Sequence, residues 1–226
     1  MSMLGDTIII NFHGIGEPER PVPDDEKPYW ISEALYESIL DRIAEARDRR
    51  RYRITFDDGN MSDVDIGLPA LRRRGLTATF FVLAGMLEER GFLNAASVRT
   101  LAREGMGVGT HGLHHPAWPD CDDARLNAEL DDSCAILNEL IAAPVTEAAI
   151  PFGRYDRRVI QALRRRPFRH VYTSDCGLAR SRAWLQPRTS IRCDMDEATV
   201  AAVVAGQRSL PKQLLDRVRV AVKRRR

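Results

Sequence analysis

Cysteine is scarce in this sequence. The 226 residues include four cysteines, at positions 121, 134, 176 and 193, and none of them belongs to a CxxC pair. Small secreted domains that are held together by disulfides have a denser and more regular cysteine pattern. The cysteine content therefore predicts a protein of a reducing compartment.

Long hydrophobic runs are also missing. No stretch is long enough to span a bilayer, and the first residues, MSMLGDTIIINFHG, have no basic start and too short an apolar stretch for a signal peptide. We therefore expect a cytoplasmic protein.

The sequence also lacks a large excess of charge of either sign. The 34 basic and 32 acidic residues leave a net charge of +2, so no global field attracts nucleic acid. Positive charge gathers locally in residues 212–226, KQLLDRVRVAVKRRR, where apolar residues recur at helical spacing. This pattern predicts a basic amphipathic helix, which either contacts an anionic membrane surface or acidic partner or packs on the core and leaves a solvated basic tail.

Hydrophobic residues make up 44% of the chain, enough to bury a core in one domain of the larger kind. Apolar runs of strand length alternate with amphipathic stretches of helical length, and this alternation predicts an α/β fold with a parallel sheet. The irregular spacing fits a distorted barrel of fewer than eight strands as well as an open doubly wound sheet. The predicted strands are 7–12, 51–56, 77–84, 106–110, 145–150 and 170–174, and the predicted helices are 31–49, 64–74, 95–103, 124–141 and 157–165.

Titratable and polar residues follow the predicted strands. Because α/β folds form their active sites at the carboxyl ends of parallel strands, these residues are candidates for one site. They are His13 after the first strand, Asp57 and Asp58 after the second, His111 after the fourth, Pro151, Phe152 and Gly153 after the fifth, and Asp175 after the sixth.

The segment THGLHHP carries a candidate metal site. His111 and His115 are four residues apart, a spacing that points both side chains the same way on a helical turn, while His114 is expected to be a bystander. Asp58 is a candidate third ligand. Two imidazoles and one carboxylate with an open fourth position are typical of catalytic zinc, and Co²⁺, Ni²⁺ or Mn²⁺ accept similar ligands.

The stretch TFDDG places two carboxylates side by side at the end of a predicted strand. Gly59 allows the chain to leave the strand sharply. If Asp58 binds the metal, Asp57 is well placed to take the proton of an activated water. Each motif alone has a plainer interpretation, because adjacent aspartates usually mark a turn and loop histidines are more often surface or core residues than ligands.

Taken together, the motifs resemble the polysaccharide deacetylases of carbohydrate esterase family 4. TFDDG at 55–59 matches the first family motif in full, and HGLHHP at 111–116 matches the second, H-[ST]-x-x-H-P, except that Gly112 replaces the hydroxyl residue. The third motif corresponds to AIPFGRYD, in which Ala149 stands where the family usually has an arginine that orients the base. The resemblance spans roughly residues 5–192.

This resemblance implies a distorted (β/α) barrel with about seven parallel strands in a single catalytic domain, which we place at residues 1–195. The residue pattern beyond it predicts a helical segment with a basic tail at 196–226. It also implies that Asp57 is the catalytic base, that Asp58, His111 and His115 bind one divalent metal, and that an acyl group is removed from a sugar.

Two residues of the family pattern are missing from this sequence, and other residues are expected to take their roles. No histidine follows His170, so the usual late general acid is missing, and we expect His13 to take its place because the first and last strands of a closed barrel are neighbours. We expect Arg188 to replace the arginine missing at Ala149. Phe152 and Gly153, for the oxyanion, and Asp175, for the substrate, complete the predicted site.

The predicted reaction is metal-dependent hydrolysis of an acyl group, an N-acetyl group, on a sugar or glycan. One alternative is a deformylase or other amide hydrolase that acts on a lipid-linked or small substrate, which suits a cytoplasmic protein. Another is an inactive relative that binds a glycan or a partner protein. The missing arginine favours that alternative, and the complete metal triad argues against it.

Overall fold

The computed structural model describes residues 6–207 of the chain. The strands of its main sheet are β1 (Asp6–Phe12), β4 (Tyr52–Phe56), β5 (Ala78–Val82), β6 (Gly107–Thr110), β7 (Glu147–Ala149), β8 (His170–Thr173), β9 (Leu178–Arg180), β10 (Leu185–Pro187) and β11 (Thr189–Ser190). The α-helices are α1 (Glu33–Ala44), α2 (Leu68–Arg73), α3 (Ala95–Arg103), α4 (Asp123–Ile141), α5 (Arg157–Arg164) and α6 (Glu197–Val204). A small second sheet pairs β2 (Gly14–Ile15) with β3 (Trp30–Ile31), and short helical turns are η1 (Lys27–Tyr29), η2 (Arg49–Arg51), η3 (Asp63–Gly67), η4 (Ala84–Met86), η5 (Trp118–Asp120) and η6 (Pro151–Gly153).

The main sheet closes on itself through one extended segment. Its strand order is β10-β8-β7-β6-β5-β4-β1-β11, with β9 antiparallel to β1. β10 pairs in parallel with β8, β11 pairs in parallel with β1, and only Arg188 separates β10 from β11. Six strands and this closing segment therefore form a barrel of seven parallel members, as predicted.

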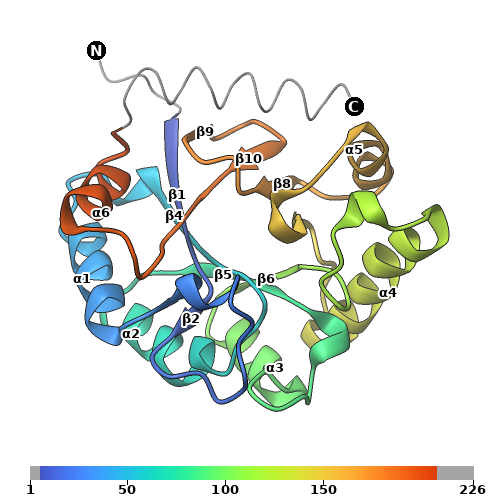
Figure 1. Cartoon of the computed structure of the whole chain (residues 1–226), viewed down its shortest axis with the longest axis horizontal. Coiled ribbons are helices and arrows are strands. Elements are labelled where there is room, and N and C mark those ends of the chain that lie inside the picture. The colour runs from blue at the N-terminus through green and yellow to red at the C-terminus, as the bar shows by residue number, and fades with distance from the viewer. Residues whose placement is uncertain (1–5, 208–226) are drawn as a thin grey trace.

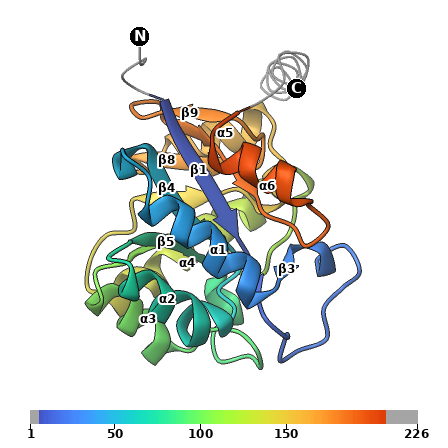
Figure 2. The same ribbon diagram turned by 90° about the vertical axis from the view of Figure 1, so that its left-hand side faces the viewer.

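The helices form a ring around the strands. Figure 1 shows α1 to α6 in chain order around the outside of the barrel. β9 and β10 occupy the sector between α5 and α6, where the described part of the chain has no helix. Figure 2 shows α6 next to α1 on the outer face near β1, and the two helices are in contact.

Strand residues alternate between two cores. Ile8, Ile10 and Phe12 of β1 belong to the main core, which includes the inner faces of the helices. Ile9 points the other way and joins a small apolar cluster with Phe81, Ala149, Tyr172 and Ala179. Because side chains alternate along a strand, Asn11 lies on the same face of β1 as Ile9.

The structure differs from the prediction at several boundaries. α1 begins after its predicted cap, Ser32, but ends at Ala44 rather than at residue 49, because the charged residues that follow provide no apolar stripe to pack. The short strands β2, β3, β9, β10 and β11 were not predicted from the sequence. Within the expected C-terminal segment, α6 is helical, and the predicted basic amphipathic helix over 212–226 lies outside the described residues.

Two further features concern the whole described range. The four cysteines all lie within it and are free. Among residues 6–207, no helix combines the length and the apolar character that crossing a membrane requires.

Candidate active site

The residues that follow β4 and β6 are held in place by main-chain hydrogen bonds that continue the sheet beyond the strand ends. The Asp57 N–H donates to the Phe12 carbonyl at 3.0 Å, and the His111 N–H donates to the Val82 carbonyl at 2.9 Å. Asp57 and His111 therefore start from backbone positions that are fixed by the neighbouring strand.

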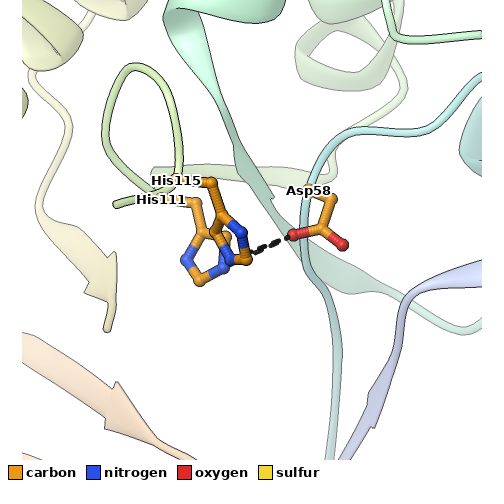
Figure 3. A group of neighbouring side chains, drawn as sticks. All are labelled: Asp58, His111 and His115. Carbon is orange, nitrogen blue, oxygen red and sulfur yellow. Dashed lines mark ion pairs between the residues drawn. The ribbon is translucent and has the colours of Figure 1, made fainter. Parts of the chain in front are cut away.

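Asp58, His111 and His115 converge on one point (Figure 3). The Asp58 Oδ1 atom lies 3.5 Å from Nε2 of His111 and 3.6 Å from Nε2 of His115. This oxygen is buried and accepts no hydrogen bond within the described residues. A buried carboxylate oxygen that faces two imidazole nitrogens and has no hydrogen-bond partner among residues 6–207 suits a metal cation, so the residues present fit a three-ligand metal site.

The two histidines are prepared to act as neutral ligands. Nδ1 of His111 lies 2.9 Å from the Ala149 carbonyl, which requires the proton on Nδ1 and leaves the Nε2 lone pair facing Asp58. Burial lowers the pKa of His111 to about 3 and also lowers the pKa of His115. Neutral imidazole is the form that binds metals.

The prediction that His111 and His115 share a helical turn is wrong. The segment between them is a loop, with a left-handed backbone at Gly112 (φ 90°) and at His115 (φ 60°). The two rings nevertheless meet, with their centroids 4.9 Å apart, because the loop folds back instead of winding as a helix.

Asp57 has a different environment from its neighbour. Arg188 donates to both of its carboxylate oxygens, at 2.6 and 2.7 Å, and the Asn11 amide donates to Oδ2 at 3.1 Å. Burial opposes ionisation of this carboxyl, but the charge of Arg188, with a smaller effect of His111, holds the pKa of Asp57 well below its usual range. Asp57 is therefore an ionised carboxylate whose orientation is fixed by Arg188 and Asn11.

Arg188 is fully buried and enters the barrel from the closing segment, between β10 and β11, rather than from beyond the last strand. Its guanidinium also lies over the rings of Phe81 and Tyr172, with 5.3 and 5.6 Å to the ring centroids. It reaches the carboxylate that the sequence predicted it to hold.

Sequence reasoning missed Asn11. Its Oδ1 accepts hydrogen bonds from Arg188 at 2.8 Å and from the Thr55 hydroxyl at 2.7 Å, while its amide group bonds Asp57. A polar residue within the otherwise apolar run TIIINF was the available indication, because such a residue in a buried strand requires polar partners.

His13 lies beside the same carboxylate. Its Nε2 atom is 3.9 Å from Oδ2 of Asp57, and its ring packs against Tyr29 with centroids 4.7 Å apart. Its Nδ1 atom is buried and forms no hydrogen bond in the part of the chain that the structure describes. The histidine at the end of the first strand therefore reaches the site, as the closed barrel predicts.

The three remaining candidates differ in their surroundings. Phe152 is 53% exposed and its ring lies 4.2 Å from that of His115, so it borders the metal site. The Gly153 N–H is used within its own turn, where it donates to the Ile150 carbonyl. The Asp175 carboxylate accepts a hydrogen bond from the Tyr155 hydroxyl at 2.7 Å.

Gly153 is required by packing. A Cβ atom at this position would come within 2.8 Å of the Ser174 side chain, and its backbone is left-handed. The two other histidines lie apart from the site: His114 is exposed, as expected for a bystander, and His170 opens β8 and pairs with Glu147.

The fold and the site define a class of protein. It is an α/β barrel with a His-His-Asp cluster at its strand ends, next to a buried carboxylate held by an arginine. A sequence model of the family described as polysaccharide deacetylase matches residues 44–171, more than half of the chain. The chain belongs to the polysaccharide deacetylase family.

Individual relatives are similar over parts of their length. A chitooligosaccharide deacetylase of Rhizobium leguminosarum bv. trifolii is 29% identical over 184 residues, which are 79% of this chain and 74% of the relative. The peptidoglycan-N-acetylglucosamine deacetylase PgdA of Listeria monocytogenes is 29% identical over 54% of this chain, a stretch that spans 25% of that protein. The Bacillus subtilis protein YxkH, whose name also refers to a polysaccharide deacetylase, is matched over 45% of its length. The match thus spans less than half of the latter two proteins.

Solved structures show the same fold. The Streptococcus pyogenes deacetylase PplD, in complex with acetate, superposes with a TM-score of 0.75 over 90% of this chain and 99% of that chain, at 17% identity. IcaB from Ammonifex degensii gives a TM-score of 0.71 over 89% and 96% of the two chains, at 19% identity. At these identities the likeness concerns the fold alone.

Proposed function

We propose that this protein is a metal-dependent hydrolase that removes the N-acetyl group from a sugar residue of a glycan. The observation that carries the proposal is the buried Asp58 oxygen, which faces two imidazole nitrogens and has no hydrogen-bond partner within residues 6–207. Beside it, Arg188 holds Asp57 ionised. Three side chains that can bind a cation, next to an oriented carboxylate that can act as base, form the arrangement that hydrolysis of an amide needs.

Asp58, His111 and His115 would hold one divalent cation, for which zinc is the first candidate and Co²⁺, Ni²⁺ and Mn²⁺ are others. The cation supplies Lewis acidity, which activates water and polarises a carbonyl near neutral pH.

Asp57 takes the proton of the attacking water. Its two oxygens are fixed by the planar guanidinium of Arg188, and the Asn11 amide supports the same geometry from β1. Because Arg188 keeps Asp57 ionised, the carboxylate is ready to accept this proton in every turnover.

His13 gives a proton to the leaving nitrogen as the carbon–nitrogen bond breaks, so that the products are acetate and a free sugar amine. Its Nε2 atom lies on the same side of the site as the Asp57 carboxylate, 3.9 Å from Oδ2. The Phe152 N–H is our candidate donor to the developing oxyanion, and the exposed Phe152 ring offers an apolar face to the sugar.

N-acetylglucosamine oligosaccharides are the substrates we propose. The names of the Rhizobium and Listeria relatives refer to chitooligosaccharide and to N-acetylglucosamine of peptidoglycan. Hydrolysis of an N-acetyl amide needs one group that takes a proton from water and another that gives a proton to the leaving nitrogen. In this site Asp57 and His13 are our candidates for these two roles.

Two measurements on the purified full chain test the proposal. Elemental analysis should find one equivalent of divalent metal, and incubation with N-acetylglucosamine oligosaccharides should release acetate and create free amines in equal amounts. A chain that binds no metal, or a metal-loaded chain that releases no acetate from any of these oligosaccharides, would contradict it.

A further inference from the structure

Glu129 is a buried carboxylate that the proposed reaction does not use. It lies in the first half of α4 and is 2% exposed. Glutamate is almost never fully buried without a partner. Its partners are the feature of interest, because they belong to the loop that carries the two histidines.

One oxygen of Glu129 binds two main-chain groups of that loop. Oε2 accepts a hydrogen bond from the Leu113 N–H at 2.6 Å and another from the His114 N–H at 3.3 Å. Both donors lie between His111 and His115. Hydrogen bonds to an ionised carboxylate are about twice as strong as those between neutral groups, so this oxygen fixes the backbone path that joins the two rings.

Gly112 is matched to this carboxylate. A Cβ atom at Gly112 would lie 2.6 Å from Oε2 of Glu129, and the backbone there has φ +90°. The family motif that the segment resembles carries a hydroxyl residue at this position. In this chain the position is glycine, and the Glu129 carboxylate of α4 lies where a side chain at this position would begin.

α4 contacts the loop at a second point. The Ser133 hydroxyl, one turn after Glu129, lies 2.7 Å from the Thr110 hydroxyl, whose oxygen accepts the Gly112 N–H at 3.0 Å. One face of the helix therefore holds both the beginning and the middle of the loop, although neither Glu129 nor Ser133 is a member of the metal cluster.

We propose that Glu129 is a positioning residue that sets the relative placement of His111 and His115 and thereby the affinity for the metal. The inference rests on the proposed metal site and extends it to α4. A carboxylate that only stabilised the fold would affect the stability of the metal-free protein and leave metal affinity unchanged. If the carboxylate instead sets the distance between the two histidines, its removal changes the metal affinity and the coordination geometry.

The test is a titration of the metal-free full chain with Co²⁺, followed by its visible absorption spectrum, for wild type, Glu129→Gln and Glu129→Asp. Glu139→Gln is the matched control, because Glu139 lies on the same helix but is exposed. We expect Glu129→Gln to weaken Co²⁺ binding roughly 10- to 100-fold, the range seen when partners of metal ligands are removed, and to alter the spectrum. The control should behave as wild type.

Glu129→Asp keeps the charge but shortens the side chain, so it should also weaken binding, and it decides the matter if Glu129→Gln does not fold. Wild-type affinity and an unchanged spectrum in the folded Glu129 variants would overturn the inference while leaving the metal site intact. If the wild-type chain binds no Co²⁺, the metal site and the inference both fail.

Discussion

At the scale of single residues, two adjacent aspartates have opposite electrostatic environments. Asp58 takes a left-handed backbone conformation (φ 75°), followed by Gly59 in the same region (φ 74°), so the chain turns immediately after Asp57. Burial acts on both carboxyls, but the guanidinium of Arg188 reaches only Asp57. Burial consequently raises the pKa of Asp58 to about 6, whereas the pKa of Asp57 is held low.

The two aspartates should be separable by mutation. Asp57→Asn should keep a full equivalent of metal and lower kcat/KM by about 10² to 10⁴, the usual contribution of a general base. Asp58→Asn should reduce metal binding itself, because it removes a ligand. Elemental analysis and acetate release, measured on the same preparations, distinguish the two effects, and equal loss of metal in both variants would contradict the assignment.

His13 should matter most when the leaving group needs a proton. His13→Ala should retain the metal and slow hydrolysis of the N-acetyl amide by about 10² or more, because a sugar amine leaves poorly unless it is protonated. An activated aryl acetate, whose phenolate leaves without help, should be hydrolysed at close to the wild-type rate. Comparable losses on both substrates would instead indicate a structural role, such as packing against Tyr29.

At the scale of helices and strands, the residues that follow each strand define the site. The sequence was sufficient to place β1, β4 to β8 and the helices up to α5, from apolar runs, apolar stripes and the alternation of strand-length and helix-length segments. It was also sufficient to single out Asp57, Asp58, His111 and His115, which the structure brings together.

Short strands could not be predicted in this way. β9, β10 and β11 contain two or three residues each, and β10 includes Gln186 and Pro187. Their own residues do not favour a strand. Their extended conformation depends on pairing with β8 and β1, which lie elsewhere in the sequence. The sequence likewise does not show which residues Asn11 and Glu129 bond, because their partners come from other elements of the fold.

One helix cap gives a test at this scale. Ser32 precedes α1 and its hydroxyl accepts a hydrogen bond from the Leu35 N–H at 3.2 Å. Ser32→Ala should lower the free energy of unfolding by about 1 kcal/mol, because a backbone donor loses its partner. Metal binding should not change.

Ser38→Ala is the matched control, since Ser38 lies inside the same helix and its hydroxyl bonds a carbonyl one turn earlier. Alanine favours helix interiors, so this variant should be as stable as wild type or slightly more stable in urea denaturation. A larger loss for Ser38→Ala than for Ser32→Ala would be inconsistent with the capping role.

At the scale of the whole molecule, the buried Asp58 carboxylate lowers the free energy of unfolding of the metal-free protein. A carboxylate oxygen without a hydrogen-bond partner, buried among residues 6–207, is unfavourable until a cation neutralises it. The packing of the surrounding barrel offsets this unfavourable burial and holds all three ligands in place. The metal should therefore stabilise the entire domain.

Saturating zinc should raise the melting temperature. At a free metal concentration of 100 times Kd, ligand linkage adds about 2.7 kcal/mol, which corresponds to roughly 5 to 10 °C for a chain of this size. Asp58→Asn should melt at a higher temperature than wild type without metal, because it removes the buried charge, and should show almost no shift with zinc. Scanning calorimetry with and without a chelator measures both, and an equal zinc shift in the variant would contradict the ligand assignment.

The closing segment of the barrel also bears on how the protein is made. A ribosome releases Asp57, both metal-site histidines and most of the strands well before it reaches Arg188, which bonds Asn11 across 177 positions of the chain. Such distant contacts form late in folding. Until β11 docks on β1, Asp57 lacks the counter-charge of Arg188 and the ring of strands is open. Nascent chains and fragments cut before residue 185 consequently carry Asp58, His111 and His115 without the arginine that bonds Asp57. If the proposed function is correct, we expect activity to appear only when the barrel is complete.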